Sequence, residues 1–304
     1  MGYNCVVLVK QVPDTKRITG DAMKEDGTVN RAALPGIFNP EDLHALEMAL
    51  GVRDRCGGTV TAVVMGPPAA CEVLRDCLGR GADRAILVTD RKAAASDTLA
   101  TSYILSCAVR KLGDVDLVFC GRQAIDGDTA QVGPQLAEKL DLPQITYAES
   151  VEAVADGTIT VRRNVGNGYE VVRAALPVLL TATDTAAAAR PPAVRKVMKS
   201  KKARARVELA AAIAEAMPDA DEAARAAEVD RRAADLAGRG LLIDQWSLAD
   251  IDADLAWCGR DGSPTKVHRI QAVVLTGKGH KTVEPTDEGL AALVGELIED
   301  HTIG

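Results

Sequence analysis

Residues 116–134 read DLVFCGRQAIDGDTAQVGP, and this stretch decides the fold. Its first five residues form a short apolar run of strand type, whereas residues 135–140 show the apolar spacing of a helix. The intervening residues, GRQAIDGDTAQVGP, are therefore predicted to form a strand-to-helix loop. Ligands of open parallel sheets gather beyond the carboxyl ends of the strands, so this loop is a candidate binding site.

Several small residues let a ligand approach the backbone of this loop; they are Gly121, Gly127, Thr129, Ala130 and Gly133. Unpaired N–H groups at a helix start favour an anion such as phosphate. Asp126 and Asp128 would repel a phosphate, so we expect them to cap the helix or to bind a ribose. Asp128 and Gln131 have capping-box spacing, which predicts a helix start at Asp128. A start at Pro134 is the alternative.

The loop matches neither the dinucleotide fingerprint GxGxxG nor the Walker pattern GxxxxGK[ST]. From its spacing alone, an ordinary turn of a parallel sheet and a nucleotide-binding loop are equally compatible with the sequence. The residues on their own define a candidate nucleotide loop and no more.

Strand patterns alternate with helical patterns through the first 140 residues. The predicted strands cover residues 5–9, 59–65, 84–88 and 116–120, and the predicted helices begin at residues 40, 69 and 97. This alternation predicts an α/β fold with a doubly wound, mainly parallel sheet. Residues 144–154, 158–164 and 169–183 follow without helices and are predicted to extend the sheet as antiparallel strands.

The exit of the first strand and the start of the first helix are further candidate walls of the site. Lys10 could touch a bound phosphate, although a solvated lysine is the more common arrangement. The sequence Asn39-Pro40-Glu41-Asp42 predicts a helix with Asn39 as N-cap and Pro40 at the first position. The apolar face of that helix would contain Leu43, Leu46 and Leu50, as in an ordinary well-capped core helix.

Net charge, apolar runs and cysteine spacing exclude several classes of protein function. The 304-residue chain carries a net charge of −7, which argues against a general polyanion binder. No run of about 18 apolar residues and no signal peptide is evident. Seven cysteines without a CxxC pair make a metal cluster improbable and fit a reducing cytoplasm. No nucleophile-and-base set suggests side-chain catalysis, so no catalytic residue and no metal ligand is assigned.

The second half of the chain changes character. Residues 183–206 run from alanine-rich to strongly basic, which is typical of a solvated charged face. Residues 207–240 predict two helices that break at Pro218-Asp219, and residues 286–299 predict a terminal helix. We expect an α/β nucleotide-binding domain over residues 1–190, a basic segment with a helical insert over 191–246, and a C-terminal arm over 247–304.

The loop GRQAIDGDTAQVGP resembles the signature loop of the electron-transfer flavoprotein β subunit. Other stretches resemble that family in the same order; they are VVLVKQVPDT (residues 6–15), NPEDLHALEMAL (39–50), RGADRAILV (80–88), LPQITY (142–147), VMKSKK (197–202) and GSPTKV (262–267). Together they cover residues 3–202 and resume near residue 247. The family's shorter sequence over residues 207–240 leaves the role of that insert open.

The resemblance implies an adenine-nucleotide-hydrolase-like fold and a nucleotide pocket. The implied cofactor-binding residues are Leu8, Val9, Lys10, Asn39, Pro40, Glu41, Asp42, Met65, Gly66, Gly121, Arg122, Gln123, Ala124, Ile125, Asp126, Gly127, Asp128, Thr129, Ala130, Gln131 and Val132. It also implies that a dehydrogenase partner docks on Val194, Lys196, Val197, Met198 and Lys199, with Val194 in place of the family's usual leucine anchor. The C-terminal arm is implied to contact an α subunit.

The family has two branches that differ in this pocket. Plain carriers hold AMP there, whereas electron-bifurcating members hold a second FAD that accepts hydride from NADH. The form AIDGDTAQVGP resembles the bifurcating branch, since plain carriers have bulkier or amide residues where Gly127, Thr129 and Ala130 stand. We therefore expect an FAD-binding β subunit that carries electrons between NADH, an acyl-CoA dehydrogenase-type partner and a second acceptor. An adenine-nucleotide-processing enzyme and a non-catalytic interaction subunit are the alternatives.

Overall fold

The computed structural model describes residues 2–14, 34–266 and 281–299. The chain forms two compact units, Met1–His268 and Arg269–Gly304. All the described strands belong to the first unit, and α9 (Asp287–Glu299) is the described helix of the second. The sequence also predicts a hairpin or long excursion around the turn pair Asp26-Gly27 and contains an apolar run at residues 270–275; both lie outside the described residues.

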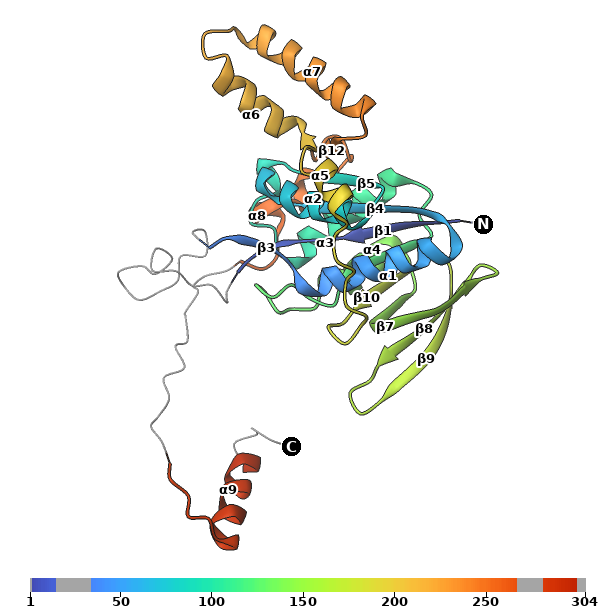
Figure 1. Cartoon of the computed structure of the whole chain (residues 1–304), viewed down its shortest axis with the longest axis vertical. Helices are drawn as coiled ribbons and strands as arrows, with labels where there is room; N and C mark the ends of the chain where they lie inside the picture. The colour runs from blue at the N-terminus through green and yellow to red at the C-terminus, as the bar shows by residue number, and fades with distance from the viewer. Residues whose placement is uncertain (1, 15–33, 267–280, 300–304) are drawn as a thin grey trace. The chain divides into compact units, whose positions relative to one another are not determined.

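Ten strands of the described chain form one sheet in the order β11-β12-β5-β4-β1-β6-β10-β7-β8-β9 (Figure 1). Their bounds are β1 Tyr3–Leu8, β4 Gly58–Met65, β5 Arg84–Val88, β6 Leu117–Gly121, β7 Gln144–Ala155, β8 Thr158–Asn164, β9 Tyr169–Ala175, β10 Val178–Ala182, β11 Arg204–Ala205 and β12 Leu242–Trp246. The strands from β11 to β7 pair in parallel, whereas β7–β8 and β8–β9 pair antiparallel. The predicted α/β class, with a mainly parallel sheet and an antiparallel extension, is confirmed.

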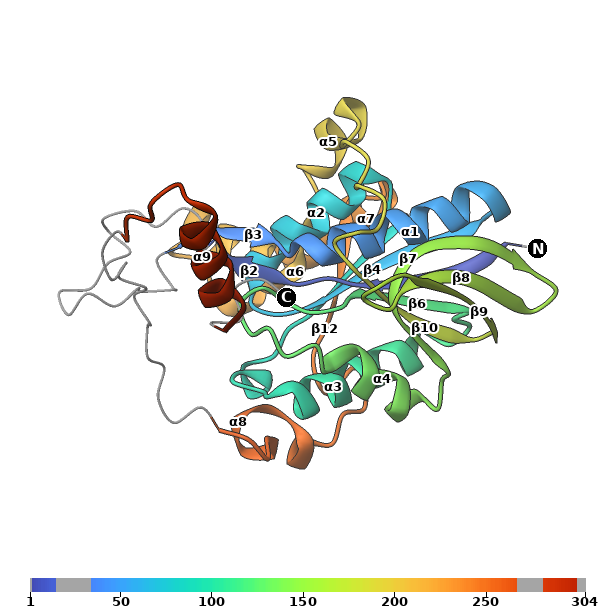
Figure 2. The same ribbon diagram turned by 90° about the horizontal axis from the view of Figure 1, so that it is seen from below.

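Helices cover both faces of the parallel part of the sheet. In Figure 2, α1 (Pro40–Cys56) and α2 (Cys71–Arg80) lie on one face, and α3 (Thr98–Leu112) and α4 (Val132–Leu140) lie on the other. Successive residues of β1 accordingly enter different cores: Val7 packs in the core under α1 and α2, and its neighbour Val6 packs in the core under α3 and α4. The doubly wound arrangement therefore leaves both faces of β1 buried.

The expected strand over residues 169–183 is in fact two strands. Strand β9 ends at Ala175, and the cis Leu176-Pro177 bond follows it. Strand β10 then lies between β6 and β7 and pairs in parallel with both. The antiparallel prediction is therefore wrong for β10. All five residues of Val178–Ala182 are buried, as expected for a central parallel strand whose two faces are both covered.

Residues 194–246 add a helical edge to the sheet. The helices α5 (Val194–Ser200), α6 (Arg206–Ala216) and α7 (Glu222–Gly238) follow one another, and β12 then joins β5 in parallel. The two predicted insert helices are confirmed, whereas β12 was not predicted. The helices α6 and α7 form a hairpin that extends away from the sheet (Figure 1) and share a small apolar cluster of Leu209, Ile213, Val229 and Ala233. The domain boundaries at residues 190 and 246 remain predictions.

Short elements complete the first unit. They are the antiparallel pair β2 (Gln11–Pro13) and β3 (Gly36–Phe38), the short helix α8 (Gly259–Gly262), and the 3₁₀ turns Pro68–Ala70, Arg91–Ala93 and Leu255–Trp257. Ser247 and Asp250 make the reciprocal bonds of a capping box, but a turn follows them instead of an α-helix. Over the described ranges, no helix is long and apolar enough to cross a membrane.

Candidate functional site

The loop between β6 and α4 lies at the carboxyl edge of the sheet, where the sequence predicted it. Helix α4, however, begins at Val132, so the predicted start at Asp128 is wrong, and so is the alternative start at Pro134. Asp128 and Ala130 have φ angles of +48° and +51°, in the left-handed region that interrupts a right-handed helix. The side chain of Asp128 accepts a hydrogen bond from Gln123 Nε2 (3.0 Å) and does not cap α4.

Side chains at the start of α1 form hydrogen bonds with the buried side of this loop. The carboxylate of Glu41 accepts hydrogen bonds from the backbone N–H of Gln123 (2.8 Å) and from Arg122 Nη2 (2.7 Å). Asn39 is fully buried; its Nδ2 donates to the carbonyl of Gln123 (2.9 Å), and its Oδ1 accepts from the N–H of Ile125 (3.2 Å). Asn39 precedes the first residue of α1 as predicted, but its side chain makes no capping bond, because the loop takes both of its polar atoms.

Asp42 joins the ends of two neighbouring strands. One carboxylate oxygen accepts from the N–H of Gly121 (2.9 Å), and the other accepts from the N–H of Lys10 (2.8 Å). Complete burial raises the pKa of the Asp42 carboxyl to about 7, although these two N–H groups and Asn39 oppose the shift. Only a glycine fits beside it at position 121, since a Cβ there would lie 2.6 Å from Asp42 Oδ1.

Two basic side chains form ion pairs with acidic side chains, one in the loop and one at the start of α1. Lys10 Nζ forms an ion pair with Asp126 at 2.7 Å, which offsets a charge that would otherwise repel a phosphate. The guanidinium of Arg122 binds the buried Glu41 and lies 5.7 Å from the ring centroid of Tyr147. Arg122 Nε is buried without a hydrogen-bond partner in the described protein, so a buried donor is unmatched beside the loop.

The outer side of the loop is open. Gly127, Asp128 and Thr129 are exposed, and a Cβ at Gly127 would meet no atom within 4 Å. The first-turn N–H groups of α4, at Val132 and Gly133, have no intrahelical acceptor, as at every helix start. The inner contacts therefore use the polar groups of α1, while the outer side offers backbone donors and space for a ligand.

The predicted site residues fall into two sets. The bonds just described join Lys10 and the acidic start of α1 to residues 121–126 of the loop. Met65 and Gly66 lie at the end of β4, next to β1, but no hydrogen bond in the described chain joins them to the loop; the N–H of Gly66 bonds to the carbonyl of Val88. Sequence reasoning missed Thr98, whose hydroxyl donates to Gln131 Oε1 (2.8 Å) from the first residue of α3. The predicted helix start at Asp97 was the sequence feature that could have pointed to Thr98.

The predicted docking residues occupy α5 and the surface around it. Val194 and Met198, four residues apart on one face, have exposed fractions of 78% and 52%. Lys196 and Lys199 are also exposed, whereas Val197 faces α2, where its Cγ2 would lie 3.2 Å from a Cβ at Gly79. An apolar face with basic neighbours therefore lies on the surface.

Two hollows flank α5. One of about 380 Å³ is lined by α2 and α5 and carries both acidic and basic side chains, including Glu72, Asp76 and Lys201. The other, of about 260 Å³, lies beside Lys196 and Lys199. Neither of these two hollows is lined by residues of the loop after β6. No cluster of metal-ligating side chains occurs in the part of the chain that the structure describes.

This arrangement, a doubly wound sheet with a small-residue loop held by the first helix, defines an α/β protein of the electron-transfer flavoprotein class. A family model described as "Electron transfer flavoprotein domain" matches residues 26–235. The chain belongs to the electron-transfer flavoprotein β-subunit family, and its function is in electron transfer.

Three relatives illustrate the match. "Electron transfer flavoprotein subunit beta" of Clostridium acetobutylicum is 40% identical, covering 99% of this chain and 100% of its own. "Protein FixA" of Bradyrhizobium diazoefficiens is 39% identical, covering 96% and 90%. "Caffeyl-CoA reductase-Etf complex subunit CarD" of Acetobacterium woodii is 37% identical, covering 98% and 99%.

Proposed function

We propose that the chain binds FAD on the loop of residues 121–132 and, together with an α subunit, carries electrons by flavin-based bifurcation. The observation that carries this proposal is the division of the loop into a held inner side and an open outer side. Glu41, Asp42 and Asn39 satisfy the inner backbone groups, so the small residues at 127, 129 and 130 are left available for a ligand.

The loop's chemistry fits a dinucleotide. Lys10 offsets the charge of Asp126, and the N-terminus of α4 supplies N–H donors and a favourable dipole for a phosphate. When bound, FAD would accept hydride from NADH and release single electrons. In this proposal the chain's own residues bind and orient that group, and no side chain performs the redox step.

The electron partners follow from the same proposal. We place an acyl-CoA dehydrogenase-type partner against Val194 and Met198, with Lys196 and Lys199 attracting acidic groups on its surface. The CarD relative is named as a subunit of a caffeyl-CoA reductase-Etf complex, and this name supports a partner of this type. The C-terminal unit with α9 would contact the α subunit, and the heterodimer would work in the cytoplasm, where the seven cysteines, none of them in a disulfide, remain reduced.

The test is a substitution of Gly127 in the heterodimer. Gly127→Leu should greatly reduce nucleotide retention, because its side chain would fill the space next to the loop without striking any protein atom. Gly168→Leu is the matched control, since position 168 is equally open and belongs to the β8–β9 connection. Nucleotide content would be measured after purification, with circular dichroism as the check on folding. Full retention in a folded Gly127→Leu variant would contradict the assignment of this loop.

A further inference from the structure

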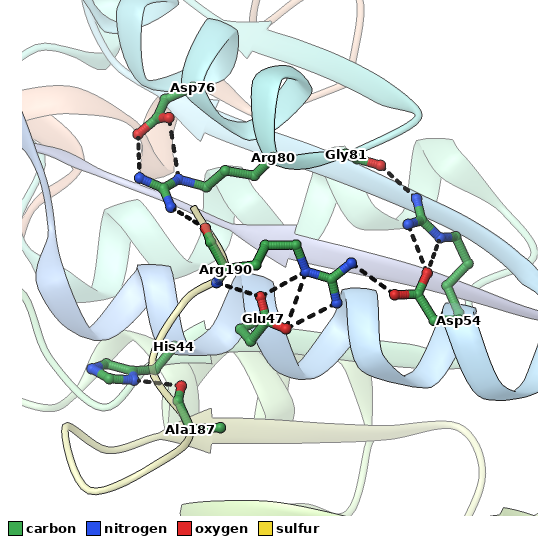
Figure 3. Close-up of polar contacts among 9 residues, drawn as sticks. His44, Glu47, Asp54, Asp76, Arg80, Gly81, Ala187 and Arg190 are labelled. Atoms are coloured by element: carbon green, nitrogen blue, oxygen red, sulfur yellow. Dashed lines mark hydrogen bonds and ion pairs between the residues drawn. The ribbon is translucent and has the colours of Figure 1, made fainter. Parts of the chain in front are cut away.

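The segment that leads into α5 runs along the side of α1 as a strap of residues 184–193. Figure 3 shows this strap beside His44, Glu47 and Asp54, which lie along α1. His44 Nδ1 lies 2.9 Å from the carbonyl oxygen of Ala187. The strap therefore contacts successive turns of α1 before it reaches α5.

Arg190 is the most heavily bonded residue of the strap. Its backbone N–H donates to Glu47 Oε2 (2.8 Å), and its Nε and Nη2 donate to the same carboxylate at 2.9 Å. Its Nη1 donates to Asp54 Oδ2 (2.7 Å). The backbone carbonyl accepts from Arg80 Nη1, and Arg80 is itself paired with Asp76 of α2. All the polar groups of Arg190 are thus bound to α1 or α2 (Figure 3).

The bonds at Arg190 are the kind that fix a backbone. Several charge-assisted bonds converge on a side chain that is only 30% exposed, and the two-pronged contact with Glu47 restricts the direction of the guanidinium. Three residues later, the N–H of Ala193 donates to the carbonyl of Gly79 at the end of α2 (3.2 Å). Helix α5 begins at the next residue, Val194.

The far end of α5 is held as well. Arg75 of α2 is buried and donates from Nη1 to the carbonyl of Ala203 (3.0 Å) and to Glu208 at the start of α6 (3.0 Å). Helix α5 has seven residues, which is too short to be stable by itself in water. The position of its exposed apolar face therefore depends on the contacts at its two ends.

We infer that Arg190 is a positioning residue for partner docking: by binding Glu47 and Asp54 it fixes the strap, and so the place at which α5 presents Val194 and Met198. This inference rests on the proposed docking role of α5. The ion pairs of Arg190 join the strap to α1 and include no residue of the nucleotide loop. Loss of Arg190 should weaken partner binding and leave nucleotide content unchanged.

The experiment is a double-mutant cycle in the α/β heterodimer with Arg190→Gln, Glu47→Gln and both together. Arg84→Gln is the matched control, because Arg84 of β5 forms a single ion pair, with Asp244 of the neighbouring strand β12. We would measure amide hydrogen exchange over residues 187–203 and the Kd for a purified butyryl-CoA dehydrogenase. Each single variant should exchange faster there and raise the Kd about 5- to 10-fold, whereas the double variant should be no worse than either single one. The electron-transfer rate at saturating partner should not change.

A parallel Val194→Ala variant separates this inference from the docking proposal. If Val194→Ala raises the Kd while Arg190→Gln does not, the positioning role is wrong and the docking proposal stands. If neither variant changes the Kd, the docking proposal fails and the inference fails with it. Unchanged hydrogen exchange in Arg190→Gln would overturn the inference whatever the partner does, because it would show that the ion pair does not fix the strap.

Discussion

At the residue scale, Asp42 is the group on which the geometry of the loop depends most. It lies in the interior, it is bonded to the N–H groups of Gly121 and Lys10, and it faces Asn39 and the thiols of Cys77 and Cys120. The charges near it belong to Lys10, which opposes the raised pKa, and to Glu41 and Arg122, which bind each other. Its carboxylate is therefore ionised in the folded state at a cost.

Because of this cost, the free energy of unfolding should depend on pH. The pKa of Asp42 is about 7 in the folded protein and 3.8 as the ordinary value, so the folded state binds more protons than the unfolded state between these pH values. The contribution of Asp42 to the free energy of unfolding thus falls as pH rises from about 4 to 7, and it is level above pH 7. The steepest slope from one group is about 1.4 kcal/mol per pH unit.

Denaturant unfolding of the wild type and of Asp42→Asn across pH 5–8 isolates this contribution. The variant loses a hydrogen-bond acceptor and should be less stable at each pH, but its deficit should shrink as pH rises towards 7. Asp128→Asn is the control, since its carboxylate is exposed. Parallel stability curves for wild type and Asp42→Asn would contradict the raised pKa.

The sequence placed Asn39, Glu41 and Asp42 next to the loop after β6, but it did not predict what they bond to. Asn39, Glu41 and Asp42 were expected beside a nucleotide, whereas the structure uses their side chains to bind the backbone of residues 121–125 and Lys10. The bonds to residues 121–125 span 79 to 86 positions of the chain, and the bond between Lys10 and Asp42 spans 32. No local pattern encodes them, because an acidic first turn looks the same whether its acids face a loop or solvent.

At the element scale, helices with their own start signals were predicted well. Helix α1 starts at Pro40 as expected, and α3 starts directly after Asp97, whose carboxylate caps it. The start of α4 was wrong because Asp128 and Gln131 have capping-box spacing without the backbone angles that a cap needs. Residues 178–182 were predicted as part of one antiparallel strand over residues 169–183, whereas β10 is a separate strand that pairs in parallel, because strand pairing depends on the whole sheet and not on the strand's own residues.

The hairpin of α6 and α7 should behave as a separately stabilised element. Its apolar cluster is small, and Ile213 is its one fully buried residue. Ile213→Ala should destabilise the hairpin by about 2–4 kcal/mol, which is large for an element with so small a core. Hydrogen exchange should then rise across residues 206–238 and remain unchanged in β4.

Glu215→Ala is the control for that experiment, since Glu215 is exposed on α6. An Ile213→Ala variant in which β4 loses protection together with the hairpin would show instead that the two unfold as one cooperative body.

At the scale of the whole molecule, helix α1 contacts both the proposed nucleotide loop and the strap that leads to the proposed docking helix. Helix α1 holds the loop with its first residues and the strap with Glu47 and Asp54 further along. The same helix therefore orients both parts of the proposed electron path. The resemblance and the family match identify the kind of molecule, and the contacts of α1 supply what the sequence did not: how the two parts are held.

The central claim is that the loop of residues 121–132 carries FAD. The most direct test is the quantity and identity of the nucleotides released from the chain purified with its α partner, measured by absorbance and chromatography. The account predicts two FAD molecules per heterodimer. One FAD and one AMP would contradict it and would make the chain the β subunit of a plain electron carrier.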